Sequence, residues 1–252
     1  MKNNYLKSIL SFFVFAIFIY GCYFGISWIA NQPKIDGIPA PLRNTLRFNE
    51  KIFTSLFSQT KKSKEFSIDE AQTRVRKNGL VGLEKNIDTG EYKVMIIRDE
   101  KDTLFISIDD IKKLPKTEVI FDFKCIEGWS QVTHWGGVKF SDFAKFYHLG
   151  TKNGSIIHDK PDMDWYKYAG LETPNGKYFV GIDMPSMMHP QTILCYEMNG
   201  KPLPNLDGAP LRLIIPVKYG VKHLKRIGKL FFSDIPPRDY WAKYGYDYYA
   251  GL

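Results

Sequence analysis

The pattern of hydrophobic and polar positions separates an apolar N-terminal segment from a mixed remainder. From Ile9 to Ala30 no charged residue occurs. At about 1.5 Å per residue, a helix over this segment reaches roughly the 30 Å of a bilayer's hydrocarbon core. Aromatic residues continue to Trp28, beyond the shorter apolar core and small-residue cleavage site of a signal peptide. The pattern therefore predicts one transmembrane helix within an N-terminal anchor at 1–30, and acylation of Cys22 is a minor alternative.

The remainder begins with a connection and then has the pattern of one folded domain. Residues 31–42 hold three prolines and a glycine, which indicates a linker. The folded domain is expected at 43–252. Amphipathic patterns predict helices over 43–62 and 67–77, and Ser141 is predicted to cap the helix that follows it.

Strand signals dominate the rest of the chain. Runs rich in β-branched and aromatic residues predict strands at 92–99, 117–125, 165–172, 178–182, 211–217 and 228–234. A short helix is expected to begin at Ser107 and to stop before Pro115, and 186–198 is expected to be helical or rich in turns. Helices and strands mix without the regular alternation of a doubly wound sheet, so the pattern predicts an α+β fold.

Composition and charge set bounds but do not indicate a function. With 252 residues, 44% hydrophobic and 15% aromatic, the chain can bury a sizeable core in one principal domain. The formal net charge of +8 would suit an anionic lipid surface or ligand, but the lysines are scattered and nothing specific favours nucleic acid. Lys2 and Lys7 precede the apolar segment while Lys34 and Arg43 follow it, so charge does not decide which side of the membrane carries the domain.

Several common enzyme signatures do not occur in the sequence. It has no Gly-rich dinucleotide fingerprint, no P-loop and no Gly-x-Ser-x-Gly elbow. The five histidines are not spaced as zinc ligands, and no Cys-x-x-Cys accompanies them. Three cysteines, one of them in the apolar segment, are too few for a disulfide framework.

Cys125 is the candidate for chemistry. It ends an apolar predicted strand and is followed by a loop-like run in which Gly128 supplies backbone freedom. A thiol at such a position can be presented to a cavity, although a cysteine of unknown role is more often a small buried hydrophobe. Cys195, within an apolar stretch taken as helical, is expected to pack.

Two longer segments carry a family resemblance. FKCIEGWSQVTHWGGVKFSDF at 123–143, and the block at 172–230 that contains NGKPLPNLDGAPLRLIIPVKYGVK, resemble the molybdopterin-binding domain of the sulfite oxidase superfamily. Within that superfamily they are most similar to the bacterial protein-methionine-sulfoxide reductase catalytic subunits. The resemblance runs from about Arg47 to the C-terminal GYDYYAGL. It implies a sulfite-oxidase-type fold with mixed sheets, a molybdenum–molybdopterin cofactor and oxygen-atom transfer.

The resemblance also implies roles for single residues. Cys125 falls where the family binds molybdenum, and a soft thiolate suits that metal beside the two dithiolene sulfurs of the pterin. Contacts to the cofactor are implied for Asn49, Thr173, Asp207, Arg212, His223, Leu224 and Lys225. Asp207 departs from the family's asparagine, and an acid cannot donate the amide's hydrogen bonds unless protonated. The basic run from Lys218 to Arg226 suits a cofactor that ends in a phosphate. His134 and His189 also lie on segments that match the family. For each of them a purely structural role is as plausible as a role in the site.

The residues after Cys125 bear on the substrate. Sulfite oxidases place arginines close to the metal cysteine, whereas here Ile126, Glu127 and Trp129 follow, so an anionic substrate would meet an acid. This favours reduction of a small or protein-bound S-oxide, or a related neutral oxide, with sulfite oxidation as the alternative. No haem or iron–sulfur motif occurs, so electrons are expected from a membrane cytochrome.

The resemblance further implies a single-pass protein of the bacterial inner membrane, with a monomeric catalytic domain that faces the periplasm. A twin-arginine leader is not found before the apolar segment, which leaves the export route open. Two other hypotheses remain. One is a metal-free enzyme in which Cys125 is a nucleophile activated by His134 or His189, and the other is a membrane-tethered binding module without chemistry. Metal content and sensitivity to alkylation distinguish the three.

Overall fold

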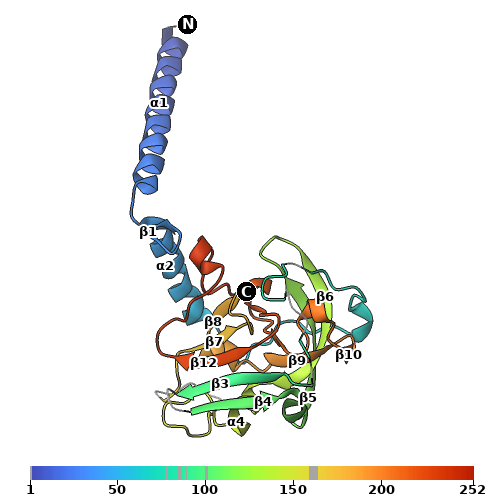
Figure 1. The fold of residues 1–252 in the computed structure, drawn as a ribbon. Helices are drawn as coiled ribbons and strands as arrows, with labels where there is room; N and C mark the ends of the chain where they lie inside the picture. Colours follow the sequence, from blue (N-terminus) through green and yellow to red (C-terminus); the bar gives the residue numbers. More distant parts are fainter. Residues whose placement is uncertain (1, 78, 84–86, 89, 100–101, 159–163) are drawn as a thin grey trace.

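The computed structural model describes residues 2–77, 79–83, 87–88, 90–99, 102–158 and 164–252 (Figure 1). Its α-helices are α1 (Lys2–Ala30), α2 (Ala40–Leu56), α3 (Ile108–Lys112), α4 (Phe140–Phe146) and α5 (Met184–Met187). Four 3-10 helices are η1 (Ile68–Glu70), η2 (Asn205–Asp207), η3 (Gly220–Lys222) and η4 (Ala242–Tyr244). The strands are β1 (Lys34–Ile35), β2 (Ile38–Pro39), β3 (Lys93–Asp99), β4 (Asp102–Ser107), β5 (Lys116–Lys124), β6 (Ser130–Lys139), β7 (Tyr168–Glu172), β8 (Phe179–Asp183), β9 (Ile193–Met198), β10 (Lys201–Pro202), β11 (Arg212–Ile214) and β12 (Lys229–Ser233).

Two five-stranded sheets form the body of the domain (Figure 1). One has the order β10-β9-β6-β5, with β11 also paired to β9, and all of its pairings are antiparallel. The other has the order β4-β3-β12-β7-β8, in which β12 and β3 are parallel and the remaining pairs antiparallel. Helices and mostly antiparallel sheets thus mix without a repeating strand–helix unit, which confirms a mixed architecture of both element types.

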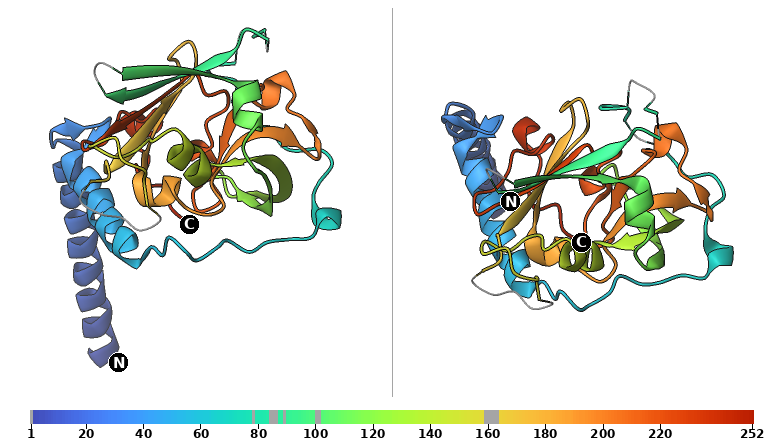
Figure 2. Two further views of the ribbon diagram at one scale, coloured as in Figure 1. Left: turned by 90° about the horizontal axis from the view of Figure 1, so that it is seen from below. Right: turned by 60° about the horizontal axis from the view of Figure 1, so that its bottom comes forward.

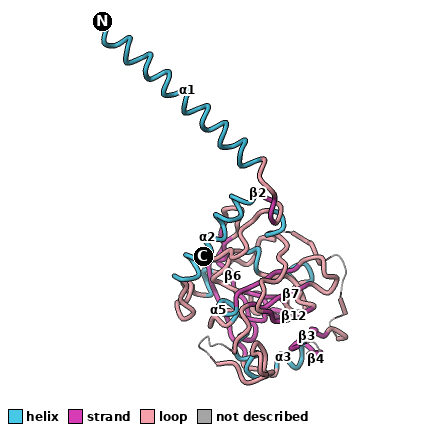
Figure 3. Tube along the Cα trace, turned by 90° about the vertical axis from the view of Figure 1, so that its left-hand side faces the viewer, coloured by secondary structure: helices cyan, strands magenta, loops and turns pink. Residues whose placement is uncertain are grey.

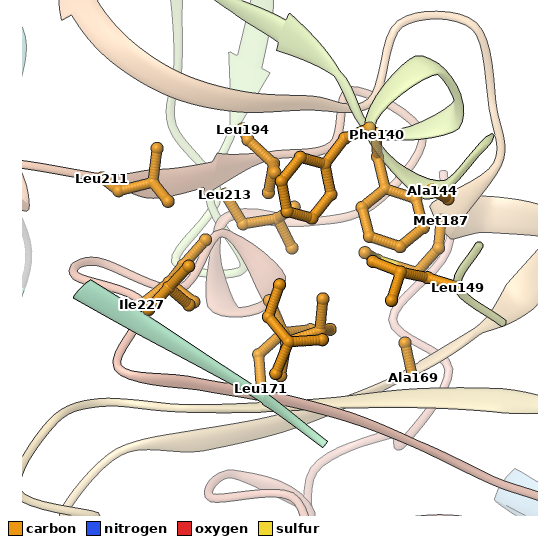
Figure 4. Packing of buried hydrophobic residues seen from close by; sticks show 14 of the residues in the cluster. Phe140, Ala144, Leu149, Ala169, Leu171, Met187, Leu194, Leu211, Leu213 and Ile227 are labelled. Carbon is orange, nitrogen blue, oxygen red and sulfur yellow. The ribbon is translucent and has the colours of Figure 1, made fainter. Parts of the chain in front are cut away.

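The main hydrophobic core lies between the two sheets (Figure 4). Leu194 on β9 and Leu213 on β11 reach it from one sheet, and Leu171 on β7 from the other. Phe140, at the start of α4, is fully buried among them. Each such side chain contributes roughly 1.5–3 kcal/mol by leaving water. The core therefore holds the sheets, and the loops between their strands, in a fixed relation.

The N-terminal helix α1 projects away from the domain (Figures 1 and 3). Its stretch Tyr5–Ala30 is apolar and long enough to cross a membrane, and none of it is buried. The predicted helix over this segment is confirmed, while its place in a membrane stays a prediction. The predicted linker 31–42 is more ordered than expected, since it contains the β1–β2 hairpin and the first turn of α2. Pro41 sits in that turn, where a missing N–H costs nothing.

The prediction of a helix over 67–77 is wrong beyond its first turn. The local start signal does form, because the Ser67 N–H donates to the Glu70 carboxylate at 2.9 Å. After η1 the chain extends along β6 instead, with the Gln72 N–H donating to the Val132 carbonyl at 3.0 Å. A tertiary hydrogen bond to a strand thus replaces the next helical turn.

Two further predictions need correction. The segment 186–198 is helical only up to Met187, and 193–198 form β9, because neighbouring strands pair with it on both sides. Cys195 therefore lies in a strand, where it is fully buried and packs as expected. Ser141 does not cap a helix, since α4 already begins at Phe140 and includes it. The predicted strands form with ends moved by a few residues, and Ser107 caps α3 as predicted.

Candidate functional site

Cys125 is held by a closed loop between β5 and β6. The last pair of that ladder is Lys124 with Ser130, so residues 125–129 make the turn. The Cys125 N–H donates to the Trp129 carbonyl (2.9 Å), and the Gly128 N–H donates to the Cys125 carbonyl (3.0 Å). Gly128 has a φ of +86°, a left-handed conformation that a residue with a Cβ adopts with strain. The loop therefore fixes the position of the thiol, whose residue is 8% exposed.

The thiol side of this loop faces a cavity of about 290 Å³. Its wall combines segments that are distant in sequence. From these segments the wall takes Val75, Arg76, Lys77, Gly79 and Val81, then Phe123, Cys125, Ile126, Glu127 and Trp129, then Gly220, Val221, His223 and Lys225, and finally Trp241 and Tyr246. Trp135, Tyr178, Asp207 and Arg212 are the other described lining residues. Aromatic walls with a few charged groups are typical of a pocket that binds a sizeable organic ligand.

The charged groups in the wall are mostly cationic. Arg76, Lys77, Arg212 and Lys225 line the cavity together with the acids Asp207 and Glu127. Lys77 forms an ion pair with the buried Asp207, with 2.8 Å between Nζ and Oδ2. Lys225 donates from Nζ to the Gly79 carbonyl at 2.7 Å, and burial lowers its pKa to about 8. The cavity thus offers positive charge to an anionic group.

Arg212 is the most deeply buried of these cations. Its Nη1 donates to the Asp207 carbonyl at 3.0 Å, and its guanidinium lies over the Trp135 ring. Burial lowers the pKa of Arg212 to about 10, so the side chain stays charged at neutral pH. Its Nε is buried and has no hydrogen-bond partner among the described residues. A buried donor without an acceptor costs free energy, which a ligand acceptor would recover.

His223 lines the cavity but has both ring nitrogens engaged. Nδ1 accepts from the Ile215 N–H (3.4 Å) and Nε2 lies 3.1 Å from the Lys218 carbonyl, so Nε2 carries the proton. Its ring stacks on Phe121 and meets the edge of Phe123. Burial lowers the pKa of His223 to about 3, which keeps the imidazole neutral. The ring forms wall surface and is not a proton donor or acceptor for a ligand.

Five residues singled out from the sequence meet at the cavity wall, and five lie elsewhere. Those that line it are Cys125, Asp207, Arg212, His223 and Lys225. The predicted residues not among the described lining residues are Asn49, Thr173, Leu224, His134 and His189. Thr173 lies behind the wall, where its hydroxyl donates to the Tyr178 carbonyl at 3.2 Å. Leu224 belongs to the main core, and Asn49 is exposed on α2.

The two candidate histidines have structural partners. His134 is buried on β6, with Nε2 3.4 Å from the Glu118 carboxylate. His189 accepts the Gln191 N–H at Nδ1 (3.2 Å), and its Nε2 lies 3.1 Å from the Lys61 carbonyl. Burial lowers the pKa of His189. Neither histidine lines the cavity at Cys125, so neither is placed to activate that thiol as a nucleophile.

The basic run from Lys218 to Arg226 is mostly structural. Lys218 pairs with Asp183 at 2.7 Å, and Lys222 pairs with Asp239 at 2.6 Å. Arg226 donates from Nε to the Ala209 carbonyl at 2.8 Å. Only Lys225 and His223 of the predicted basic cluster reach the cavity. Sequence analysis missed Arg76, Lys77, Tyr178, Trp241 and Tyr246, and no local pattern marks them as neighbours of Cys125.

In the part of the chain that the structure describes, no group of three or more His, Cys, Asp or Glu side chains could hold a metal ion. A metal bound by Cys125 would therefore take its other ligands from a cofactor or from solvent. The residues present fit a molybdopterin. Cys125 offers a soft thiolate for the metal, Arg212 with its unpartnered Nε and Lys225 suit the polar and anionic parts, and aromatic walls suit the ring system.

Comparisons with known proteins agree with this fit. The chain is 34% identical over 203 residues to the protein-methionine-sulfoxide reductase catalytic subunit MsrP of Campylobacter jejuni, covering 75% of this chain and 63% of that protein. It is 30% identical over 167 residues to the putative protein-methionine-sulfoxide reductase subunit YedZ1 of Azospira oryzae, covering 66% and 58%. The chain thus spans less than two thirds of either relative.

Among solved structures, the sulfane dehydrogenase SoxCD of Paracoccus pantotrophus aligns with a TM-score of 0.49 at 17% identity, over 60% of this chain and 40% of that one. Residues 81–241, which include the Cys125 loop and most of the cavity wall, match the oxidoreductase molybdopterin binding domain. The chain therefore belongs to the family of oxidoreductases with a molybdopterin-binding domain.

Proposed function

We propose that this chain is a molybdenum-dependent enzyme of oxygen-atom transfer that reduces an S-oxide or a related neutral oxide. The observation that carries the proposal is the position of Cys125, whose side chain lies in the wall of a cavity that also holds buried cations. The relatives named as methionine-sulfoxide reductases support the reductive direction.

Each wall residue has a role in this proposal. Cys125 ligates molybdenum through its thiolate, a soft ligand suited to that metal. Arg212 and Lys225 hold the polar and anionic parts of the molybdopterin, and Asp207 keeps Lys77 in the wall through their ion pair. The bound cofactor supplies the two-electron redox chemistry.

The protein's own residues orient the segments of the cavity wall, exclude water from the cavity and hold protons on fixed side-chain atoms. The Tyr178 hydroxyl donates to the Val221 carbonyl at 2.7 Å, and burial raises its pKa, so it stays protonated and fixes the 220–225 stretch. Neutral His223 likewise holds this part of the wall in place, through its hydrogen bonds with the backbone of Ile215 and Lys218. Phe123 and Trp241 add apolar surface that limits the access of water.

The charged side chains at the Cys125 loop bear on which substrate charge the site accepts. Glu127 is exposed at this loop and accepts a hydrogen bond from the Trp129 indole N–H at 3.1 Å. A carboxylate there repels a sulfite dianion and is tolerant of a neutral S-oxide. Arg76 stacks on the Trp129 ring, with 4.7 Å between Cζ and the ring centroid, and lines the same cavity. This arginine, close to the Cys125 loop, favours the second candidate, sulfite oxidation.

The supply of electrons is part of the same proposal. Helix α1 acts as a single-pass anchor in the bacterial inner membrane, with the domain at 43–252 on the periplasmic side. A membrane-bound haem protein delivers the electrons. A relative whose name marks it as a reductase subunit supports a complex of this kind.

The decisive experiment measures metal content. Full-length protein made in a molybdopterin-competent host is expected to contain about one molybdenum per chain, and Cys125→Ser is expected to lose the metal. Cys195→Ser is the matched control, because that cysteine is buried on β9 outside the cavity. X-ray absorption at the molybdenum edge then tests for a thiolate contributed by the protein. Protein from a molybdopterin-deficient host shows the background.

Activity assays divide the remaining hypotheses. Methionine sulfoxide is expected to oxidise a reduced dye through the loaded enzyme, whereas sulfite is expected not to reduce the oxidised dye. Full metal loading of Cys125→Ser would contradict the proposed ligand. Activity of metal-free protein that alkylation abolishes would point to the cysteine-nucleophile enzyme instead.

A further inference from the structure

Helix α2 exposes large apolar side chains that an ordinary surface helix buries. Its one buried residue, Arg43, is 2% exposed and faces the domain, where its guanidinium donates to the carbonyls of Asp36, Ala242 and Tyr246. Five of its large apolar side chains face outward, and we call them the outer face of α2. They are Leu42 (45% exposed), Phe48 (63%), Ile52 (41%), Phe53 (60%) and Leu56 (72%). A helix of a water-soluble domain buries such a face, so this one requires a partner.

The outer face lies close to the end of the apolar helix α1. The Ala40 N–H donates to the Pro33 carbonyl at 2.8 Å, so α2 starts directly at the β1–β2 hairpin that follows α1. The two helices do not form one rod, since α2 turns away from the line of α1 and runs beside the domain (Figures 2 and 3). If α1 crosses a bilayer, as proposed above, the hairpin lies at the membrane surface and α2 is close to that surface from its first turn.

The surroundings of the hairpin have the composition of a membrane interface. Trp28, near the end of α1, is 53% exposed, and Tyr244 and Tyr246 are 56% and 40% exposed on the segment that Arg43 holds. Tryptophan and tyrosine are enriched at the level of lipid headgroups, because one end of each ring is apolar and the other polar. Lys34 and Lys51 are exposed on the hairpin and on α2, which adds positive charge.

We propose that the outer face of α2 lies in the headgroup region of the same bilayer that α1 spans, on an anionic lipid surface. Apolar side chains inserted to that depth, with basic residues beside them, are the features by which amphipathic helices bind lipid. The inference rests on the proposed role of α1 as an anchor, and it adds a second, lateral contact that limits how the domain can rotate about the anchor.

This contact also orients the cavity. Trp241 and Tyr246 line the cavity, and the same segment is tied to α2 through Arg43. A bilayer beneath α2 therefore lies close to the wall that these residues form. The cavity is held near the membrane, where a membrane-bound electron donor resides.

The test compares two neighbouring positions on one helical turn. Full-length chains with Cys22→Ser and either Phe53→Cys or Thr54→Cys carry a nitroxide label in vesicles of phosphatidylcholine and phosphatidylglycerol, at low protein density and without any partner protein. Phe53 is on the outer face and Thr54 is exposed on the other side of the helix. Power-saturation measurements are expected to show Phe53→Cys several-fold more accessible to oxygen, and less to a water-soluble nickel chelate, than Thr54→Cys. The Cys22→Ser chain alone corrects for labelling of Cys125.

The outcomes separate this inference from the anchor itself. Label on the native Cys22 of α1 reports whether that helix is in lipid. If Cys22 is in lipid but Phe53→Cys is as accessible to nickel as Thr54→Cys, the anchor stands and the proposed contact of α2 is wrong. That result would assign the outer face to a protein partner. Spin–spin broadening at Phe53→Cys that grows with protein density would instead assign it to a second copy of the chain and would equally overturn the proposal.

Discussion

Arg212 lies over the indole ring of Trp135, with 4.5 Å between its Cζ and the ring centroid, and the same guanidinium donates to the Asp207 carbonyl. Stacking and a directed hydrogen bond both depend on the planar shape of arginine. Arg212→Lys keeps the charge and loses this shape, and the lost interactions are each worth roughly 1–2 kcal/mol. We expect the variant to retain its cofactor about tenfold more weakly, measured as molybdenum and pterin content after extended dialysis.

A control for the stacking contact lies in the segment after β12. Arg238 also stacks on an aromatic ring, that of Phe179 at 4.1 Å, but it does not line the cavity at Cys125. Arg238→Lys should leave cofactor content unchanged. Equal losses in both variants would show that a general loss of stability, and not a contact in the cavity, explains the effect.

From the lowered pKa of Lys225 we predict that cofactor retention depends on pH. Burial lowers its pKa from 10.5 to about 8, so its charge is present below pH 8 and is lost as the pH rises through that value. An anionic group held by Lys225 is therefore expected to dissociate more readily between pH 7 and about 9. Lys225→Arg, whose pKa lies well above this window, should remove the dependence. The measurement is cofactor loss against pH for the two proteins side by side.

In the protein without cofactor, raising the pH has the opposite effect: the contribution of Lys225 to the free energy of unfolding increases. Its pKa is lower in the folded chain than in the unfolded chain, so the unfolded state binds more protons between pH 8 and 10.5. Its contribution to the free energy of unfolding thus rises with pH across that window. Cofactor release without any such rise would contradict the assignment of the effect to Lys225.

The ion pair between Lys222 and Asp239 predicts a large effect on stability. Both side chains are almost fully buried, and Lys222 also donates to the Gly181 carbonyl at 3.0 Å. Lys222→Met leaves a buried carboxylate without its cation and is expected to lower the free energy of unfolding by roughly 3–5 kcal/mol. Lys113→Met breaks the exposed pair with Asp110 and should change stability far less. Urea denaturation of the four proteins, including Asp239→Asn, measures the differences.

Gly137 on β6 predicts a second stability effect, with its neighbour as control. A Cβ at Gly137 would lie 2.2 Å from the Leu194 carbonyl oxygen on the paired strand β9, and backbone cannot move aside easily. At Gly136 the nearest atom to a Cβ is the flexible Glu197 carboxylate, at 3.1 Å. We expect Gly137→Ala to destabilise the domain by roughly 1–3 kcal/mol and Gly136→Ala by clearly less, by thermal unfolding. The reverse order would contradict the pairing of β6 with β9.

The position of Cys125 could be predicted because its signals are local. A β-rich run followed at once by a glycine-containing loop is visible in a few residues, and the loop closes through bonds between Cys125 and its near neighbours. The contribution of Arg76 to the same cavity could not be predicted. Its segment has a helix start signal at Ser67, and only the long-range bond from Gln72 to Val132 shows that the chain extends there.

Strand β9 shows the same limit. Its apolar run is compatible with a buried helix or a buried strand, and the choice is made by β6 and β11, which pair with it from distant parts of the sequence. The basic run near Lys222 shows the converse case. Charge in the sequence suggested ligand binding there, whereas acids from other segments, such as Asp239, neutralise Lys222 within the fold.

The cavity wall joins Arg76 and Lys77 to Trp241 and Tyr246, which come far later in the sequence. The wall therefore cannot close until both segments have left the ribosome and have folded against each other. A bulky ligand that depends on this wall is bound only after that step, so its loading follows folding and does not nucleate it.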